Sequence, residues 1–418
     1  MDAKVRLEHT VLAVDGEHDV HAMVEIVAPE LENASAREPL RLALVLDRSG
    51  SMAGRKLEVA KRCASWLVGR LDRRDELALV AYDDEVRLLA PLSAPGDAHR
   101  RAIAALGPGG QTNLSGGWLK GVEALGRANG PGVRKVLLLS DGLANVGITD
   151  SPALAELAAN AHERGLGTTT IGFGEDFDEE LMTALAQAGG GYAHFAETPD
   201  AAPAIFSQEL EGLTSVVAQN VSVEIRPGAD VEIVGILNDF PAVAVDGGVQ
   251  VELGDAYAGE RRRVVLGFHV PHLAALGPVA VAEIVLRYVS VGEEIVQHEV
   301  TIPVVANAVS AEEAARAVPD AEVREEVLVL RAARARDEAM RSADAGDVGS
   351  AHARLHAAAD ELRSTGFDAL VDEAALLERL GEEIALEYTA SHRKQLHYQS
   401  WQSRQGRSRP PEESAPRS

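Results

Sequence analysis

The sequence is poor in cysteine and in long apolar segments. Cys63 is the only cysteine among 418 residues, so no internal disulfide can form, and this favours a reducing compartment. No apolar run approaches the roughly 18 residues that a membrane-spanning helix needs. The first twenty residues also lack the basic stretch followed by an apolar one that is typical of a signal peptide. These absences favour a soluble, cytoplasmic protein.

Positive charge is scarce as well. Lysine and arginine total 40 residues against 65 aspartate and glutamate residues, which gives a net charge of −25. A chain this acidic is a poor candidate for binding nucleic acid or anionic membranes, whereas it could attract cations or a basic partner. Its length is sufficient for two or three domains.

Residues 41–215 carry the pattern of an α/β domain. Continuous apolar runs of strand length alternate with stretches of helical periodicity, the latter at 55–71, 114–128, 151–165 and 178–188. This alternation predicts a mostly parallel sheet with helices on both faces. The sequence of residues 85–90 indicates an additional strand at the edge of this sheet.

The flanking segments predict other architectures. Residues 219–306 alternate polar and apolar positions between turn signals, which is typical of a small β-sandwich. The alternating pattern of residues 3–28 predicts two strands. Isolated strands leave unpaired backbone groups at their edges, so we expect these two to pair with strands of 219–306. The α/β domain would then be inserted into the sandwich. The run 261–263, three arginines, is expected at an exposed strand edge or turn.

The expected organisation therefore has five parts. They are N-terminal sandwich strands (1–36), an α/β domain (37–215), the rest of the β-sandwich (216–308), a C-terminal helical bundle (309–390) and a disordered basic tail (391–418). The bundle is predicted from apolar residues at helical spacing in three segments separated by glycines. The tail is predicted from its polar, basic composition.

Polar oxygen-bearing residues gather where the predicted strands end. The stretch LVLDRSGSMAGRK places Asp47, Ser49 and Ser51 directly after an apolar run, Asp141 ends a second run, and Thr112 lies in the glycine-rich loop GPGGQTNLSGG. Ligands of open parallel sheets bind at the carboxyl ends of strands. Carboxylate and hydroxyl oxygens without histidine or cysteine suit Mg²⁺, Mn²⁺ or Ca²⁺.

Three separated motifs, DRSGSM, Thr112 in GGQTNLSGG and Asp141 in LLLSDG, resemble the metal-ion-dependent adhesion site (MIDAS) of von Willebrand factor A domains of bacterial intracellular type. The resemblance implies a Rossmann-like, doubly wound fold. It also implies direct metal ligation by Ser49 and Ser51, ligation by Thr112 in the ligand-competent state, and contacts of Asp47 and Asp141 mainly through water. An open coordination position would then accept an aspartate or glutamate from a partner.

The expected function is thus a metal-dependent protein-interaction module rather than an enzyme. The resemblance makes a MoxR-type AAA+ ATPase, or a kinase–phosphatase pair in stress or defence, plausible as partners. The alternative is a Mg²⁺- or Mn²⁺-dependent hydrolase or phosphatase that uses Asp47. Against that alternative, the chain shows no P-loop, no nucleophile-elbow pattern and no second aspartate two residues after Asp47.

Overall fold

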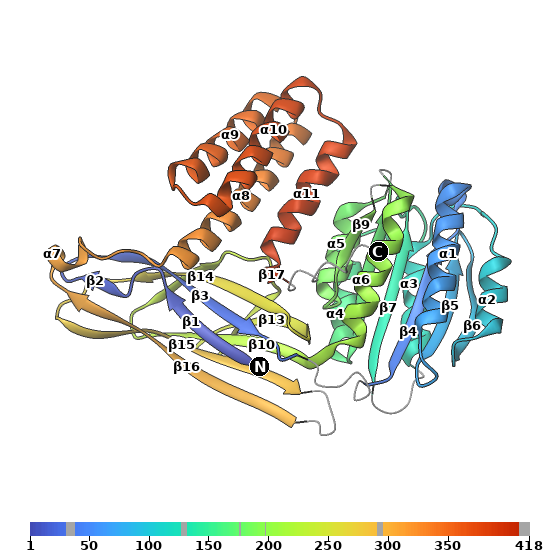
Figure 1. Cartoon of the computed structure of the whole chain (residues 1–418), viewed down its shortest axis with the longest axis horizontal. Coiled ribbons are helices and arrows are strands. Elements are labelled where there is room, and N and C mark those ends of the chain that lie inside the picture. The colour runs from blue at the N-terminus through green and yellow to red at the C-terminus, as the bar shows by residue number, and fades with distance from the viewer. Residues whose placement is uncertain (31–37, 127–131, 175–176, 197, 291–295, 409–418) are drawn as a thin grey trace, which may run out of the picture. The chain divides into compact units, whose positions relative to one another are not determined.

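The computed structural model describes residues 1–30, 38–126, 132–174, 177–196, 198–290 and 296–408 (Figure 1). The chain divides into two compact units. An α/β unit comprises Leu31–Gln219 and Ser290–Ile295, and a sheet–helix unit comprises Met1–Glu30, Asn220–Val289 and Val296–Ser418. No helix in the described part of the chain combines the length and the apolar character needed to cross a bilayer.

The α/β unit is built on a six-stranded sheet in the order β6-β5-β4-β7-β8-β9. Its strands are β4 (Leu40–Asp47), β5 (Glu76–Tyr82), β6 (Val86–Ser93), β7 (Val133–Ser140), β8 (Leu166–Phe173) and β9 (Ala193–Ala196). All pairs are parallel except β5 with β6, which is antiparallel and forms the edge expected from the sequence. The winding reverses between β4 and β7, so a switch point lies at their carboxyl ends.

Helices cover this sheet on both faces, and its central strands are buried along their length. All eight residues of β4 and of β8 are buried, as in a parallel sheet packed on both sides. The helices are α1 (Arg55–Arg70), α2 (Asp97–Ala104), α3 (Leu114–Gly126), α4 (Ser151–Glu163), α5 (Glu179–Ala188) and α6 (Ala202–Thr214). Residues of α3, α4 and α5 share one core with alternate residues of β4, β5 and β7, and α1 contacts α2 and α6. The predicted α/β architecture is therefore present.

A buried ionic cluster ties α6 to the sheet. Glu209 of α6 is 2% exposed. One oxygen of its carboxylate accepts a hydrogen bond from the Thr169 hydroxyl (2.7 Å), and the other lies 3.0 Å from His194 Nε2. Burial alone would raise the pKa of Glu209, but the His194 contact, the charge of the fully buried Lys135 and the Thr169 hydroxyl lower it to about 2. The ionised carboxylate therefore stabilises the folded unit.

The sheet–helix unit contains two sheets. The first has the order β1-β3-β14-β11 with β17 paired to β14, and the second has the order β12-β13-β10-β15-β16-β2. Their strands are β1 (Asp2–Leu7), β2 (Val11–Ala13), β3 (His18–Val27), β10 (Val216–Pro227), β11 (Glu232–Ile236), β12 (Ala242–Val245), β13 (Gly248–Tyr257), β14 (Arg261–Val270), β15 (Gly277–Ser290), β16 (Val296–Val309) and β17 (Arg407–Ser408). In Figure 1 the two sheets lie as two layers.

The N-terminal strands join sheets made by the later part of the chain. β3 pairs antiparallel with β14 from His18↔Val270 to Val27↔Arg261, and β2 pairs parallel with β16. The pairing of 3–28 with 219–306 follows from the apolar positions of β3, since these are buried only when a sheet and its cover are complete.

The C-terminal region differs from the expectation of three helices and a disordered tail. The helices are α7 (Ala311–Ala314), α8 (Ala321–Asp344), α9 (Val348–Ser364), α10 (Val371–Leu386) and α11 (Ala390–Arg404). The prediction of disorder is wrong for 391–408, because α11 buries Leu396 and Trp401, Ser400 Oγ donates to the Ala333 carbonyl of α8 (2.9 Å), and β17 extends the first sheet. Residues 409–418 lie outside the described part.

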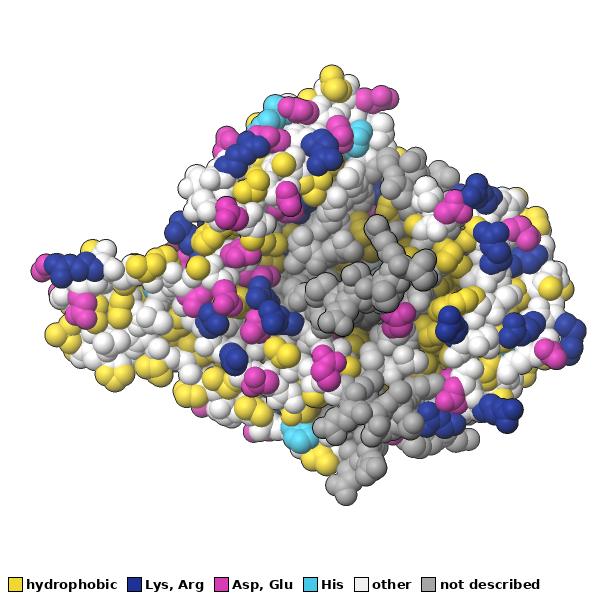
Figure 2. All heavy atoms as spheres, viewed as in Figure 1, with side chains coloured by type: hydrophobic (Ala, Val, Ile, Leu, Met, Phe, Trp, Pro, Cys, Tyr) yellow, Lys and Arg dark blue, Asp and Glu magenta, His cyan; other side chains and the backbone are white. Residues whose placement is uncertain are grey.

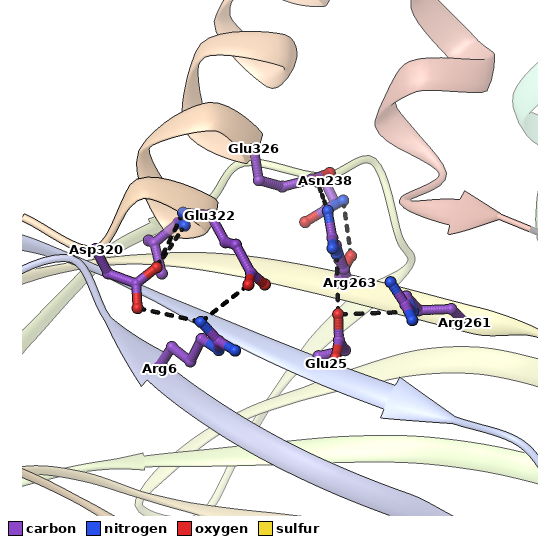
Figure 3. A network of polar contacts seen from close by, with 9 residues as sticks. Arg6, Glu25, Asn238, Arg261, Arg263, Asp320, Glu322 and Glu326 are labelled. Atoms are coloured by element: carbon purple, nitrogen blue, oxygen red, sulfur yellow. Dashed lines mark hydrogen bonds and ion pairs between the residues drawn. The ribbon is translucent and has the colours of Figure 1, made fainter. Parts of the chain in front are cut away.

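A polar network fastens α8 to the first sheet (Figure 3). Arg263 of β14 contacts Glu25 of β3 at 3.2 Å and Glu326 of α8 at 2.8 Å, and Arg6 of β1 contacts Glu322 at 3.2 Å. Beside these ion pairs, Met23 and Val265 form an apolar core with α8.

The arginine run 261–263 was expected at an exposed strand edge or turn, and the structure does not place it there. β14 lies between β3 and β11, and Arg262 is only 1% exposed. Its guanidinium reaches Glu260 at 2.8 Å and the Leu253 carbonyl at 2.5 Å. Alternation along the strand sends Arg262 to the opposite face from Arg261 and Arg263.

Replacement of Glu209 by glutamine should weaken the α/β unit at pH 7 by roughly 2–3 kcal/mol, because the negative charge that His194, Thr169 and the nearby Lys135 stabilise in the interior would be removed. The folded pKa of Glu209 lies below the 4.5 of an ordinary glutamate. Its contribution is therefore complete above pH 4.5 and is lost as the pH falls from 4.5 towards 2. Hydrogen exchange of β8 in the full chain, measured across this range, should show the loss in the wild type and a smaller loss in Glu209→Gln.

The exposed Glu211 on the same helix provides the matched control. Glu211→Gln should leave the exchange of β8 unchanged. Equal protection of β8 in Glu209→Gln and wild type at pH 7 would contradict a stabilising role for the ionic cluster.

Candidate metal centre

Asp47 is the last residue of β4 and is fixed through both carboxylate oxygens. Oδ1 accepts the backbone N–H of Ser49 at 2.8 Å, and Oδ2 accepts the hydroxyl of Ser140 at 2.7 Å. The second bond follows from the parallel register, which sets Leu46 against Leu139 and so brings the ends of β4 and β7 together. Asp47 has no exposed surface.

Ser49 and Ser51 follow Asp47 on a turn that precedes α1. Their hydroxyl oxygens lie 3.1 Å apart. The turn continues as a short 3₁₀ segment, Gly50–Met52, and Met52 is buried, which anchors the turn to the domain. Ser49 is 1% exposed, whereas Ser51 is exposed. The site therefore opens towards solvent beside Ser51.

Asp141, directly after β7, completes a connection across the two strands. Its Oδ1 accepts the Ser51 hydroxyl at 2.7 Å, and its Oδ2 lies 2.5 Å from the ammonium of Lys56 on the first turn of α1. The Asp141 side chain is fully buried and that of Lys56 is 23% exposed. The sequence alone does not distinguish Lys56 from neighbouring Arg55, because both carry a positive charge and only their positions around the helix differ.

The loop before α3 brings Thr112 to the same place. The Thr112 N–H donates to Asn145 Oδ1 at 2.9 Å, and the N–H of Gly50 donates to the Gly110 carbonyl at 2.9 Å. A Cβ placed on Gly142 would lie 3.1 Å from Ser51 Oγ, 3.2 Å from Thr112 Oγ1 and 4.0 Å from Ser49 Oγ. Three hydroxyls therefore surround one point, and the absence of a side chain at Gly142 leaves that point accessible.

Asp83, which follows β5, holds this loop. It is 3% exposed, contacts Arg48 at 2.6 Å and accepts the Gly110 N–H at 3.1 Å. A Cβ on Gly109 would lie only 1.8 Å from Asp83 Oδ2, so the loop can pass there only as glycine.

The electrostatics of the site suit a cation. Burial raises the pKa of Asp47 to about 6, although the hydrogen bonds from Ser49 and Ser140 oppose the rise. Two buried carboxylates and three hydroxyls form an oxygen-only donor set, which fits Mg²⁺, Mn²⁺ or Ca²⁺ rather than a softer metal. Among the residues that the structure describes, no group of three or more His, Cys, Asp or Glu side chains is arranged to hold a metal.

All five residues predicted from the sequence meet at one edge of the sheet. Asp47, Ser49, Ser51 and Asp141 are connected by hydrogen bonds, and Thr112 joins them through the shared approach to Gly142.

Comparison with known proteins places this site within a recognised domain. Residues 42–208 match the model of the von Willebrand factor type A domain. An uncharacterized protein of Synechocystis is 28% identical over 273 residues, which cover 63% of this chain and 64% of that protein. The E3 ubiquitin-protein ligase WAV3 of Arabidopsis thaliana is 30% identical over 267 residues, which cover 59% of this chain and 33% of that protein. The chain thus spans less than two thirds of these relatives.

The whole chain also resembles a solved structure in its fold. A von Willebrand factor type A protein from Catenulispora acidiphila superposes with a TM-score of 0.77 at 18% identity, covering 96% of both chains. The strand order, the helices on both sheet faces and the matched family model agree over the α/β unit. Residues 42–208 of this chain therefore match the von Willebrand factor type A domain, and the fold of the α/β unit agrees with that match.

Proposed function

We propose that this chain binds a divalent cation and, through it, the carboxylate of a partner protein. The residues that would hold the cation are Asp47, Ser49, Ser51, Thr112 and Asp141. The observation that carries this proposal is the convergence of three hydroxyls on the point beside Gly142, flanked by only two carboxylates. von Willebrand factor type A domains typically mediate protein–protein interaction.

The donor set explains why a partner would be anionic. Hydroxyl ligands carry no charge, so a cation held mainly by them keeps its attraction for an additional carboxylate. The exposed Ser51 marks the open side from which an aspartate or glutamate of a partner could approach. Mg²⁺ is the expected ion, and Mn²⁺ or Ca²⁺ suits the same oxygen set.

The geometry favours interaction over hydrolysis at Asp47. A nucleophilic carboxylate needs an oxygen that can reach its substrate, whereas both oxygens of Asp47 accept hydrogen bonds and the residue is fully buried. The match to WAV3, a ligase, covers a third of that protein and does not extend its activity to this chain. Phosphatase turnover with Mg²⁺ or Mn²⁺ that disappears in an Asp47 variant would favour the enzyme instead.

The proposed setting is the bacterial cytoplasm, because a single cysteine permits no internal disulfide. Cys63 is buried, and its burial raises the thiol pKa to about 11, so this cysteine is suited to a packing role rather than to redox chemistry. On the face drawn in Figure 2, acidic and basic side chains are interspersed and form no continuous basic patch of the kind nucleic acid requires. A MoxR-type AAA+ ATPase or a kinase–phosphatase pair remains the proposed kind of partner.

Asp47→Asn should abolish most Mn²⁺ binding, with at least a ten-fold loss of affinity in calorimetry. Asparagine retains the size of the side chain and removes the charge. Its amide oxygen can still accept the Ser49 N–H, and its amide nitrogen can donate to the Ser140 hydroxyl oxygen, which then acts as the acceptor. Alanine would leave the Ser140 hydroxyl without its buried partner, so Asp47→Ala should also lower the melting temperature.

Thr112→Ala should spare much of the Mn²⁺ affinity and weaken carboxylate binding more. Acetate binding to the Mn²⁺-loaded protein can be followed through the water-proton relaxation rate, which falls when a carboxylate displaces bound water. Asp97→Asn, an exposed residue on α2, controls for cations that gather on the acidic surface. Mn²⁺ affinities that are equal in wild type and Asp47→Asn would exclude the proposed centre.

Gly142→Ala should reduce Mn²⁺ affinity by about ten-fold while changing the melting temperature little. The added methyl group would lie between the Ser51 and Thr112 hydroxyls, at 3.1 and 3.2 Å, and the hydroxyls would have to separate. Gly96→Ala is the control, because nothing lies within 4 Å of its added Cβ. An unchanged Mn²⁺ affinity in Gly142→Ala would mean that the cation binds elsewhere.

A further inference from the structure

Lys56 brings a second positive charge to the proposed centre. Its ammonium lies 2.5 Å from Asp141 Oδ2, while the other oxygen of Asp141 accepts the Ser51 hydroxyl. The carboxylate is thus shared between a lysine on one side and the hydroxyl cluster on the other. Such a charge-assisted contact to a fully buried carboxylate is among the stronger polar interactions in a protein.

The backbone around Lys56 leaves room for this arrangement. Gly174, which follows β8, has a φ of +70°, and a Cβ there would lie 3.4 Å from Lys56 Cε and 3.5 Å from Nζ. The lysine chain therefore passes closely over the end of β8 before reaching the end of β7. Neighbouring Arg55 instead contacts Asp200 at 2.5 Å in an exposed pair, so the two basic residues of this turn have separate roles.

Charge balance shows what Lys56 would change. Asp47 and Asp141 are both buried and together would neutralise one divalent cation. Lys56 adds one positive charge beside them. With the lysine present, the loaded site carries one more positive charge than it would without it, and this charge lies beside the carboxylate of Asp141. That additional charge would favour the approach of a carboxylate from a partner.

We propose that Lys56 is a positioning residue that lowers the affinity of the centre for its cation and raises the affinity of the loaded centre for a carboxylate. The inference rests on the proposed function. In the metal-free protein, Lys56 supplies the cation that the buried Asp141 needs. When the metal is bound, Lys56 repels it and attracts the incoming anion, with energies that fall as salt screens them.

The test compares Lys56→Met, which removes the charge, with Lys56→Arg, which retains it. Lys61→Met is the matched control, because Lys61 lies on the same helix and pairs with Glu58 at 3.0 Å. Each full-length variant is titrated with Mn²⁺ by calorimetry at low and high salt. The Mn²⁺-loaded proteins are then titrated with acetate, followed by water-proton relaxation.

Lys56→Met is expected to bind Mn²⁺ about ten-fold more tightly at low salt, and its loaded form should bind acetate about ten-fold more weakly. Its metal-free form should melt at a lower temperature, and Mn²⁺ should restore more stability to it than to wild type. Lys56→Arg and Lys61→Met should behave as wild type in both titrations. A lysine with a merely structural role would change the melting temperature without these opposite shifts in affinity.

Two outcomes separate this inference from the proposed function. Equal Mn²⁺ and acetate affinities in wild type, Lys56→Met and Lys56→Arg would overturn the role of Lys56 and leave the metal centre standing. Absence of Mn²⁺ binding in all variants would overturn the centre itself, and the role of Lys56 with it. If Lys56→Met does not fold, a Lys56→Arg affinity that departs ten-fold from wild type overturns the dependence on charge.

Discussion

The parallel register of β4 and β7 is the constraint on which the candidate centre depends. Pairing of Leu46 with Leu139 aligns the two strands so that both end at the same edge of the sheet. Asp47 and Ser140 then meet through a hydrogen bond of 2.7 Å, and Asp141 follows immediately. A shift of one residue would turn these side chains to the opposite faces of the sheet. The apolar core therefore fixes the polar site, since burial on both faces specifies the register.

The main features of this site could be predicted from the sequence because they depend on local order along the chain. Continuous apolar runs predict buried parallel strands, and the polar residues that end each run predict the edge where ligands gather. Asp83 and Lys56 could not be found in this way. Asp83 accepts a hydrogen bond from the loop residue Gly110, 27 residues later in the chain, and Lys56 contacts the carboxylate of Asp141, 85 residues away. Such contacts follow from tertiary packing, to which charge and spacing in the sequence give no specific guide.

The C-terminal region shows why composition alone can mislead. The segment of α11 is polar and basic, which favours disorder, yet two of its polar residues are buried. Ser400 has no exposed surface and Lys394 is 4% exposed. A capping box formed by Thr389 and His392 starts the helix, and Asn238 accepts the Val265 N–H while donating to the carbonyls of Arg263 and Arg404. Hydrogen bonds between α11 and the rest of the unit thus add to the burial of Leu396 and Trp401.

The buried ion pairs of this protein differ in how much of the positively charged side chain is exposed to solvent. Arg262 is as buried as its partner Glu260, and fully buried Lys135 lies near Glu209, so these charges are enclosed together. Breaking such an arrangement leaves a charge in the interior, which is costly. The pair of Lys56 and Asp141 is asymmetric, because the carboxylate is enclosed while the ammonium is 23% exposed at the end of a flexible chain. Charges that are enclosed on both sides thus belong to the interior of the two units, whereas the ammonium of the Lys56–Asp141 pair meets solvent at the edge where the three hydroxyls converge.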